Sequence, residues 1–365
     1  MSTGLLRNAT PYLAEAWPFV DDEGAEGQLL VVKLQYRIGA QGELTPLSET
    51  EPLIFEDRYD DNFAAEGPLQ GLAPLLRPAD VMAPQPATNV LLQGHAHPPA
   101  ANTKRPFEPW LGVGASVFPM RVHAPRRWRK RWLLTRLLTL FVPRRFKIRR
   151  EGLVGEVALS WQHAYGGIDK LRGRGTPQFW PYNPAGLGFH VEPKAASIAG
   201  LALPLIEHPL KRIRRWQDRR APQLPGAINA RWSPRAATGG TRDARWQATR
   251  APAMPADGTA LFHNTAHPAL QFTPHLQGGV RVRAVGFLPD DAVLGFELPQ
   301  HGFQLHAYHY GAFKSQPVPL NTVLINADAS SLTLLYRAFV PELMHGNTLQ
   351  RLALGSAEHA PELQP

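Results

Sequence analysis

The sequence contains no cysteine among its 365 residues. This absence excludes disulfides, thiolate zinc sites, iron–sulfur clusters and a cysteine nucleophile. The chain also lacks any run of 18 uninterrupted apolar residues, and its first residues show neither the basic start nor the apolar stretch of a secretory signal. We therefore expect a cytoplasmic protein with no membrane span.

Long helical patterns are also scarce, and short segments typical of β-strands take their place, at residues 28–38, 146–165, 278–289 and 320–341. The first alternates polar and apolar residues, which predicts a half-buried strand. The second predicts a hairpin turning at Gly152 or Gly155, and the last a hairpin around Asp-Ala-Ser-Ser. The expected fold is mainly β, with antiparallel sandwich-like sheets, long irregular loops and few short helices.

Proline and glycine number 36 and 31, too few for a low-complexity chain, and 44% of the residues are hydrophobic. The composition therefore supports a folded core. We expect residues 1–341 to form one β-rich domain or two packed β lobes, with a basic insertion at about 124–151. Residues 342–365 are polar and are expected to form a loose tail.

Acidic residues are absent from residues 126–150, which hold eleven Arg or Lys. Subtracting these eleven charges from the net charge of +9 leaves −2 for the rest of the chain. Residues 131–141 place their apolar side chains on one helical stripe, which predicts an amphipathic helix. The candidate partner-binding residues in this segment are Arg126, Arg127, Trp128, Arg129, Lys130, Arg131, Trp132, Arg136, Arg144 and Arg145.

Three interpretations of this basic segment remain open. It could be a loop whose apolar residues cover the protein's own core while the charged heads stay in water. It could dock on a partner protein, or bind an anionic membrane or nucleic acid. We favour a protein partner over a membrane, and a nucleic acid is not expected, because such proteins more often spread bases over a whole face. A second basic run, residues 211–220, carries six bases and one acid.

His95 and His97 stand two apart at the end of an apolar run, so a strand would place both imidazoles on one face. With a third ligand from His263 and His267, or from His306 and His309, they would suit a metal-dependent hydrolase. No acidic residue lies close to them in sequence. We therefore expect no metal site and keep the hydrolase as the alternative.

Other catalytic patterns are missing. No Gly-x-Ser-x-Gly elbow and no phosphate-binding loop are present, so no catalytic residue and no cofactor are expected. Several phrases instead combine an aromatic residue with a glycine or proline turn, which favours structural turns over ligand contacts. The candidate structural residues are Gly94, Ala96, Pro98, Trp161, Tyr165, Gly166, Gly167, Asn183, Gly186, Trp232, Arg235, Gly240 and Trp246.

Taken in order, these phrases resemble a bacterial family of unknown function encoded beside type VI secretion spike and effector genes. The phrases are NATPYLA, VVKLQYRI with PLIFEDRY, DVMAPQPATNVLLQGHAHPP, WQHAYGG, YNPAGLGF, LPLIEHP, INARWSPRAATGGTRDARWQATRAPAMP, LFHNTAHPALQ and GGVRVRAVGFLP. The resemblance covers roughly residues 8–340. It implies a cytoplasmic adaptor or chaperone without catalytic activity, whose partners are a cognate toxin effector and the spike protein.

The resemblance also bears on two local features. Gly94, Ala96 and Pro98 match the family's Gly-x-Ala pattern followed by proline, and neither neighbouring histidine belongs to it. The chain departs from the family in its long, basic segment at about 124–151. It also departs at Gln162 and His163, where an acidic residue is common, so a site that needs that acid is not expected.

Overall fold

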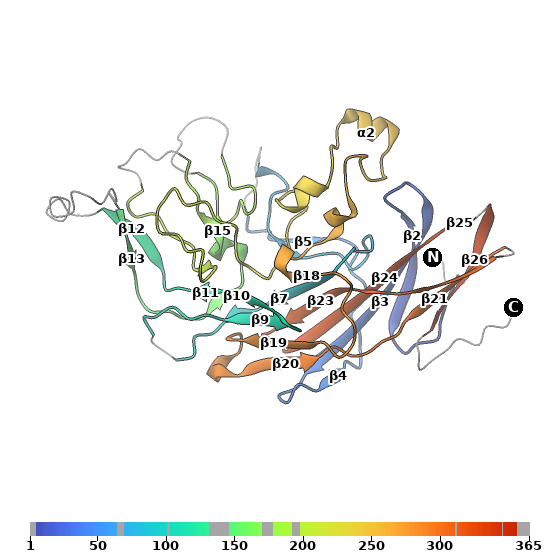
Figure 1. Cartoon of the computed structure of the whole chain (residues 1–365), viewed down its shortest axis with the longest axis horizontal. Helices are drawn as coiled ribbons and strands as arrows, with labels where there is room; N and C mark the ends of the chain where they lie inside the picture. Colours follow the sequence, from blue (N-terminus) through green and yellow to red (C-terminus); the bar gives the residue numbers. More distant parts are fainter. Residues whose placement is uncertain are drawn as a thin grey trace.

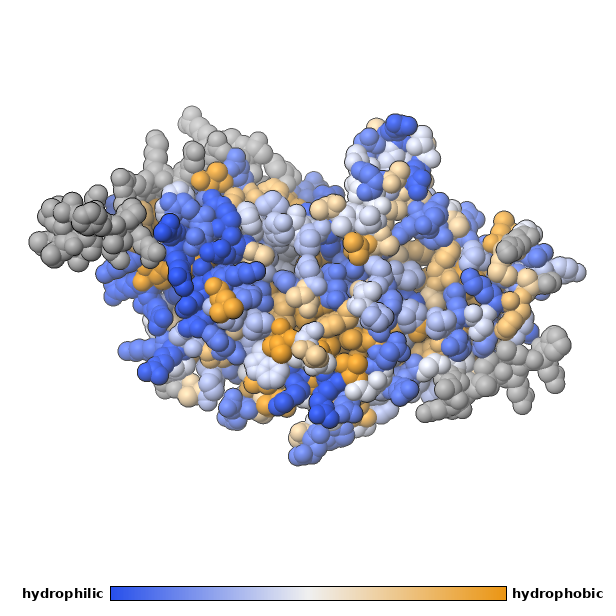
Figure 2. Space-filling model, viewed as in Figure 1, coloured by the Kyte–Doolittle hydropathy of each residue, from blue (hydrophilic) through white to orange (hydrophobic). Residues whose placement is uncertain are grey.

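The structure is a computed structural model and is mainly β, as the sequence predicted. It describes residues 5–63, 69–100, 103–130, 146–169, 178–191, 198–310, 312–344 and 346–355. Along the longest axis, β12 and β13 lie at one end, β25 and β26 lie at the other, and the largest sheet lies between them (Figure 1). Hydrophilic residues are dense on the face near β12 and β13 (Figure 2).

The largest sheet has seven strands. Its order is β18 (Gln271–Phe272), β7 (Thr88–Gln93), β23 (Leu320–Asn326), β24 (Ser331–Pro341), β3 (Glu26–Ile38) and β2 (Leu13–Val20), with β4 (Leu44–Pro46) paired to β3. Neighbours are antiparallel except β7 and β23, which run parallel. The hairpin predicted within 320–341 is thereby confirmed as β23 and β24.

Two further sheets complete the main layers. The four-stranded sheet has the order β10 (Ser116–Pro119), β9 (Trp110–Val113), β19 (Arg281–Val285) and β20 (Val293–Glu297). The other contains β1 (Leu6–Asn8), β26 (Asn347–Gly355), β21 (Gln304–His309) and β22 (Ala312–Pro317), with β25 (Leu343–Met344) on β26. The segment 278–289, predicted as a strand, contains β19, in which Val282 and Ala284 are buried while Arg281 and Arg283 are exposed.

Short elements connect these sheets. The two-stranded pairs are β5 (Arg58–Tyr59) with β6 (Leu75–Arg77), β8 (His95–Ala96) with β14 (Val157–Ala158), β11 (Arg121–Val122) with β17 (Ile206–Glu207), β12 (Arg126–Lys130) with β13 (Phe146–Arg150), and β15 (Tyr165–Gly166) with β16 (Leu187–Gly188). The helices are α2 (Ala244–Thr249) and the 3₁₀ turns η2 (Trp161–His163), η3 (Arg235–Thr238), η4 (Ala260–His263), η5 (Pro268–Leu270) and η6 (Pro289–Asp291). None of the described helices is long and apolar enough to cross a membrane.

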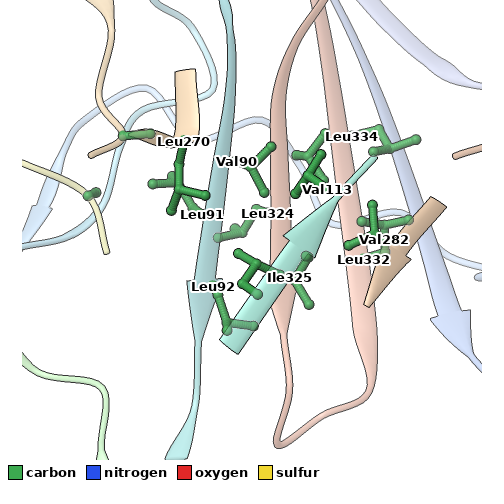
Figure 3. Close-up of a cluster of buried hydrophobic side chains, with 14 of the residues drawn as sticks. Val90, Leu91, Leu92, Val113, Leu270, Val282, Leu324, Ile325, Leu332 and Leu334 are labelled. Atoms are coloured by element: carbon green, nitrogen blue, oxygen red, sulfur yellow. The ribbon is translucent and has the colours of Figure 1, made fainter. Parts of the chain in front are cut away.

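The main core lies between the seven-stranded and four-stranded sheets. Val113 on β9 and Val282 on β19 lie over the side chains of β24, including Leu332 and Leu334 (Figure 3). All four side chains are almost fully buried. Two sheets packed through alternating apolar residues form a β-sandwich, which explains why the sequence alternates on strands such as β19.

The second face of the seven-stranded sheet is also covered, so β3 is not the half-buried strand that its alternation predicted. Leu29 and Val31 on β3 pack with Leu335 on β24 and with Leu53, which precedes β5. Lys33, on the same face of β3, has no exposed surface. A continuous apolar run buried on both faces is typical of a central strand, and here it includes one lysine.

A buried polar network accommodates that lysine. The Lys33 ammonium lies 2.8 Å from the Asp80 carboxylate and also donates to the Pro52 carbonyl. Arg337, fully buried on β24, donates from Nε to the Asp80 backbone carbonyl and from Nη1 to the Thr322 hydroxyl. Burial lowers the pKa of the Arg337 guanidinium to about 10. Buried charges persist only where partners of this kind compensate them.

Two sequence-based expectations about strands are wrong. Residues 146–165 do not form a hairpin with each other, because β13 pairs with β12 and β14 pairs with β8. The segment after residue 341 is not a loose tail, because β26 lies between β1 and β21 and buries Leu352 and Leu354. Its last part, 356–365, lies outside the described residues. Alternation in the sequence indicates that a segment is a strand, but it does not say which other strand will pair with it.

The burial of β26 predicts a large cost for trimming it. Replacing Leu352, which is fully buried, by alanine removes apolar contacts and leaves a cavity, at a cost of about 2–5 kcal/mol. The matched change Leu343→Ala, at a side chain that is 61% exposed, should cost under about 0.5 kcal/mol. Urea unfolding monitored by tryptophan fluorescence measures both. Equal small losses would mean that β26 is not packed as described.

The Lys33–Asp80 pair predicts that removing one partner costs more stability than removing both. Asp80→Asn leaves Lys33 buried without a carboxylate and should reduce the unfolding free energy by about 3–5 kcal/mol. Adding Lys33→Met to that variant removes the unpaired charge, so the double variant should be more stable than Asp80→Asn alone. Asp61→Asn, at an exposed position, serves as the control. Additive losses in the double variant would contradict the coupling.

A cationic hairpin as the candidate interaction surface

The hairpin of β12 and β13 places its apolar residues on one face. Trp128 and Phe146 are buried, and Ile148, directly opposite Trp128, packs against the same cluster. This second core contains Phe189 and also Ile213 from the second basic run. In a pleated strand every second side chain points to the same face, so Trp128 on β12 and Phe146 and Ile148 on β13 all point inward and anchor the hairpin.

The opposite face of the hairpin is basic. Arg127 stands directly across from Arg149, and Arg129 directly across from Lys147. Like charges directly opposite on paired strands destabilise the pairing. Glu151 offsets part of this repulsion, with its carboxylate 2.9 Å from Arg127 and 3.2 Å from Arg129.

Within the described part of the chain, no carboxylate lies at ion-pair distance from Lys147 or Arg149. Both residues are exposed. Hydrophilic residues dominate the molecular face near this hairpin (Figure 2). The described residues thus hold more positive than negative charge on this face, and its support is well anchored, which suits recognition of an acidic surface.

The candidate partner-binding residues divide into three groups. Arg127, Arg129 and Lys130 are exposed on β12. Arg126 and Trp128 are buried, so these two side chains are not available at the surface. The remaining residues, and with them the predicted amphipathic helix at 131–141, lie outside the described residues: Arg131, Trp132, Arg136, Arg144 and Arg145.

Sequence reasoning did not select the bases of β13. Lys147 and Arg149 complete the charged face, and Arg150 lies opposite Arg126. The strict alternation in FKIRR was the available signal, but it was assigned to a hairpin with residues that follow it. Once β13 is paired with β12, the same alternation places its bases beside those of β12.

The motif that contains His95 and His97 lies at a strand junction. Gly94 has a φ of +125°, and a Cβ there would lie 2.7 Å from an Asp328 carboxylate oxygen, so glycine is required. Ala96 on β8 is fully buried and pairs with Val157. Pro98 is half-buried at the end of this motif.

His95 contacts two acidic residues that are distant in sequence. Its Nδ1 lies 2.8 Å from Asp328, in the turn between β23 and β24, and 3.6 Å from Glu156. His97 Nδ1 lies 4.0 Å from Glu156. His95 therefore has acidic neighbours that the local sequence does not show, because the fold brings Asp328 from a turn and Glu156 from the residue before β14.

The later histidine pairs do not join this motif. His263 pairs with Asp22, and His309 Nε2 lies 3.0 Å from the Pro341 carbonyl oxygen. In the part of the chain that the structure describes, no three His, Asp or Glu side chains are grouped so that they could hold a metal ion. The ligand set proposed for the alternative hydrolase is therefore not assembled by the described residues.

The segment that contains Tyr165, Gly166 and Gly167 packs closely against the segment that contains Asn183 and Gly186. The Asn183 side-chain amide donates to the carbonyls of Trp161, at 2.8 Å, and Tyr165, at 3.2 Å. A Cβ at Gly166, whose φ is +153°, would lie 2.0 Å from the Asn183 carbonyl. A Cβ at Gly186 would lie 2.5 Å from the Asn183 amide nitrogen. Close backbone approach of this kind leaves room for glycine alone.

The remaining candidate structural residues make similar contacts. The indole of Trp232, fully buried, and that of Trp246 on α2 each donate to a backbone carbonyl. Arg235 donates to two carbonyls, and burial lowers its pKa to about 10. Gly167 and Gly240 have φ values of +105° and +69°. These contacts hold the long irregular segments against the sandwich.

Comparison with known families gives one match. A model of the family described as "Uncharacterized protein conserved in bacteria (DUF2169)" matches residues 23–337. No curated protein and no solved structure gives a significant match. The matched residues include the seven-stranded sheet from β3 to most of β24 and the whole cationic hairpin.

The histidines yield a pH-dependent prediction. Burial, and then the charge of His208, lower the pKa of His267 to about 4. Its Nδ1 accepts a hydrogen bond from the Ala269 amide, so the neutral ring fits the fold. The unfolded chain takes up this proton near pH 6.5 and the folded chain does so only near pH 4, so stability falls as pH decreases between these values.

The expected contribution of His267 between pH 7 and pH 5 is a loss of about 1–2 kcal/mol. His267→Gln removes the titrating group, so its unfolding free energy should decline less over this range than that of the unchanged protein. Urea titrations at the two pH values measure the difference. Parallel pH dependence in both proteins would exclude His267 as the source.

Proposed function

The chain belongs to the DUF2169 family of bacterial proteins, and from that premise we propose that it is an effector adaptor or chaperone of a type VI secretion system. In this proposal it binds a cognate toxin effector in the cytoplasm and helps to load it onto the spike protein. The work is done by protein–protein contacts, without catalysis. The ordered resemblance of the sequence phrases supports this function, and the cationic hairpin supports the mode of binding.

The observation that carries the mode of binding is the outer face of β12 and β13. Its cross-strand pairs, Arg127 with Arg149 and Arg129 with Lys147, repel each other, and among the described residues only the Glu151 carboxylate lies at ion-pair distance from this face, next to Arg127 and Arg129. Such an arrangement costs stability, and an acidic partner would recover that cost on binding. Its inward residues, Trp128 above all, hold the face in place.

The anchoring of the hairpin matters for affinity. A face that is ordered before binding loses little conformational entropy when the partner arrives. Charges at the rim of an interface act mainly on the association rate, and salt screens them. We therefore expect fast, salt-sensitive capture of an acidic surface, with apolar contacts elsewhere supplying the remaining affinity.

The metal-dependent hydrolase gains no support from the described geometry. His95 already contacts Asp328 and Glu156, and the later pairs represented by His263 and His309 have other partners. A membrane or nucleic-acid surface would satisfy the same charges as an acidic protein. The binding experiment below distinguishes those partners.

The test is charge reversal of the hairpin face. Arg129→Glu, Lys147→Glu and Arg149→Glu together should weaken binding to the effector encoded by the neighbouring gene by about tenfold or more, because three attractions become repulsions. A matched triple variant reverses three exposed bases elsewhere, Arg37, Arg245 and Lys314, and should bind as the unchanged protein does. Titration calorimetry with the purified effector, at low and high salt, measures both.

Two outcomes would contradict the proposal. One is an absence of any complex with the neighbouring effector or the spike protein at low salt, with all proteins folded. The other is stronger binding to anionic vesicles or duplex DNA, lost in the hairpin variant, since that would assign the charged face to lipid or nucleic acid.

A further inference from the structure

A cavity of about 410 Å³ opens at the base of the cationic hairpin, on the side away from its outward charges. It lies between the two strands of the hairpin and the second basic run. Its lining residues, taken from three separate parts of the sequence, are His123, Arg126, Ile148, Arg150, Arg212, Ile213 and Arg214. The tertiary structure therefore gathers four arginines around one cavity.

The carboxylate of Glu207, beside this cavity, is already engaged. Glu207 Oε2 lies 3.1 Å from His123 Nε2 and 3.1 Å from Arg126, and its other oxygen accepts from the Ile213 amide. Burial alone would raise the pKa of Glu207, but its contact with His123 and the charge of Arg126 outweigh that effect and hold this pKa below its usual range. Glu207 therefore stays charged, and it contacts His123 and Arg126 at the inner side of the cavity.

The other three arginines of the cavity have no such partner. Within the described ranges, no carboxylate lies at ion-pair distance from Arg150, Arg212 or Arg214. The Nε atoms of Arg126 and Arg212 are buried, and no described atom accepts a hydrogen bond from them. Buried donors are normally paired in folded proteins, so these groups favour a bound species that supplies acceptor oxygens.

The charge balance points the same way. Burial, followed by the charges of the nearby bases Arg150 and Arg121, lowers the pKa of Arg126 despite its contact with Glu207. Burial first, opposed by Glu207 and reinforced by Arg126, also lowers the pKa of His123. Four arginines against the carboxylate of Glu207 still leave the described lining positive, which favours an anion over a cation.

Phosphate fits these donors better than a carboxylate does. A guanidinium presents its N–H groups as a planar fork that matches phosphate oxygens two at a time, and several forks can share one phosphate because it offers more oxygens than a carboxylate. Arg150 ends β13, and Arg212 and Arg214 come from the irregular second basic run, so they can approach a tetrahedral group from different directions.

We infer that this cavity is an oxyanion site that takes a phosphate group, either as inorganic phosphate or as part of a small phosphate ester. The site is separate from the outward face formed by Arg127, Arg129, Lys147 and Arg149, and the inference does not depend on the proposed adaptor function. Occupancy would stabilise the packing of the second basic run against the hairpin, because one anion would bridge residues of both.

The test is titration of the full chain with inorganic phosphate at constant ionic strength. We expect saturable binding and a rise in melting temperature that follows the phosphate concentration. Arg212→Gln and Arg214→Gln should each weaken phosphate binding by about tenfold or more, because each removes a charged donor from the cavity. Arg214 is exposed, so its variant should fold even if that of Arg212 does not.

Arg215→Gln provides the matched control, since Arg215 is an exposed base of the same run that does not line the cavity. It should leave phosphate affinity unchanged. Parallel titrations with glycerol 3-phosphate, sulfate and acetate define the ligand class. Binding of glycerol 3-phosphate as well as phosphate supports an ester ligand, and binding of phosphate alone supports the free ion.

Three results would overturn the inference. The first is an absence of saturable phosphate binding. The second is acetate binding as tight as phosphate binding, which would assign the cavity to a carboxylate. The third is an equal loss of affinity in Arg215→Gln and Arg214→Gln, which would reduce the effect to general screening of a positive surface.

Discussion

The buried ion pair between Lys33 and Asp80 is the constraint on which the packing of the largest sheet depends. β3 lies in the interior of the seven-stranded sheet and is covered on both faces, so Lys33 cannot reach water. Asp80 meets it at 2.8 Å and brings the segment before β7 over the second face of the sheet. Arg337, from the adjacent β24, donates to the backbone of that same segment. One buried lysine thereby fixes the path of a segment distant in sequence.

A second consequence follows from the burial of β3 on both faces. With its centre fixed by apolar packing on one side and the ion pair on the other, the sandwich can carry strained or repulsive features at its end. The hairpin of β12 and β13 uses that tolerance: Trp128 and Phe146 fasten one face, and opposed bases occupy the other. Like charges can lie side by side in a folded protein when the stability gained from the surrounding packing is larger than the stability that their repulsion removes.

The elements that the sequence predicted well are those whose pattern is local. β19 alternates along its length, and β23 with β24 forms a hairpin closed by a short turn, so neighbouring residues alone specify them. β13 and β26 were misassigned for the opposite reason. β13 pairs with β12, the strand before it, rather than with the residues that follow it, and the segment expected to be a loose tail forms β26, which lies between the distant strands β1 and β21. Partner choice depends on the whole fold.

The candidate site shows the same division. The concentration of charge in residues 126–150, without any acid, was visible in the sequence. The inward position of Arg126 and the outward position of Arg149 were not, because they depend on which strand pairs with which. The contacts of His95 were likewise set by a distant residue, since Asp328 reaches it from the turn after β23.

By itself, the sequence determined that this protein has no thiol chemistry, that it is built from strands, and that its positive charge is concentrated in one segment. Composition and short-range periodicity carry that information directly. Only the tertiary structure decided that Lys33 is buried, that β26 completes a sheet, and that Arg150 and Arg214 face one cavity. These facts arise from contacts between residues far apart in the chain, and such contacts leave no periodic trace in either partner alone.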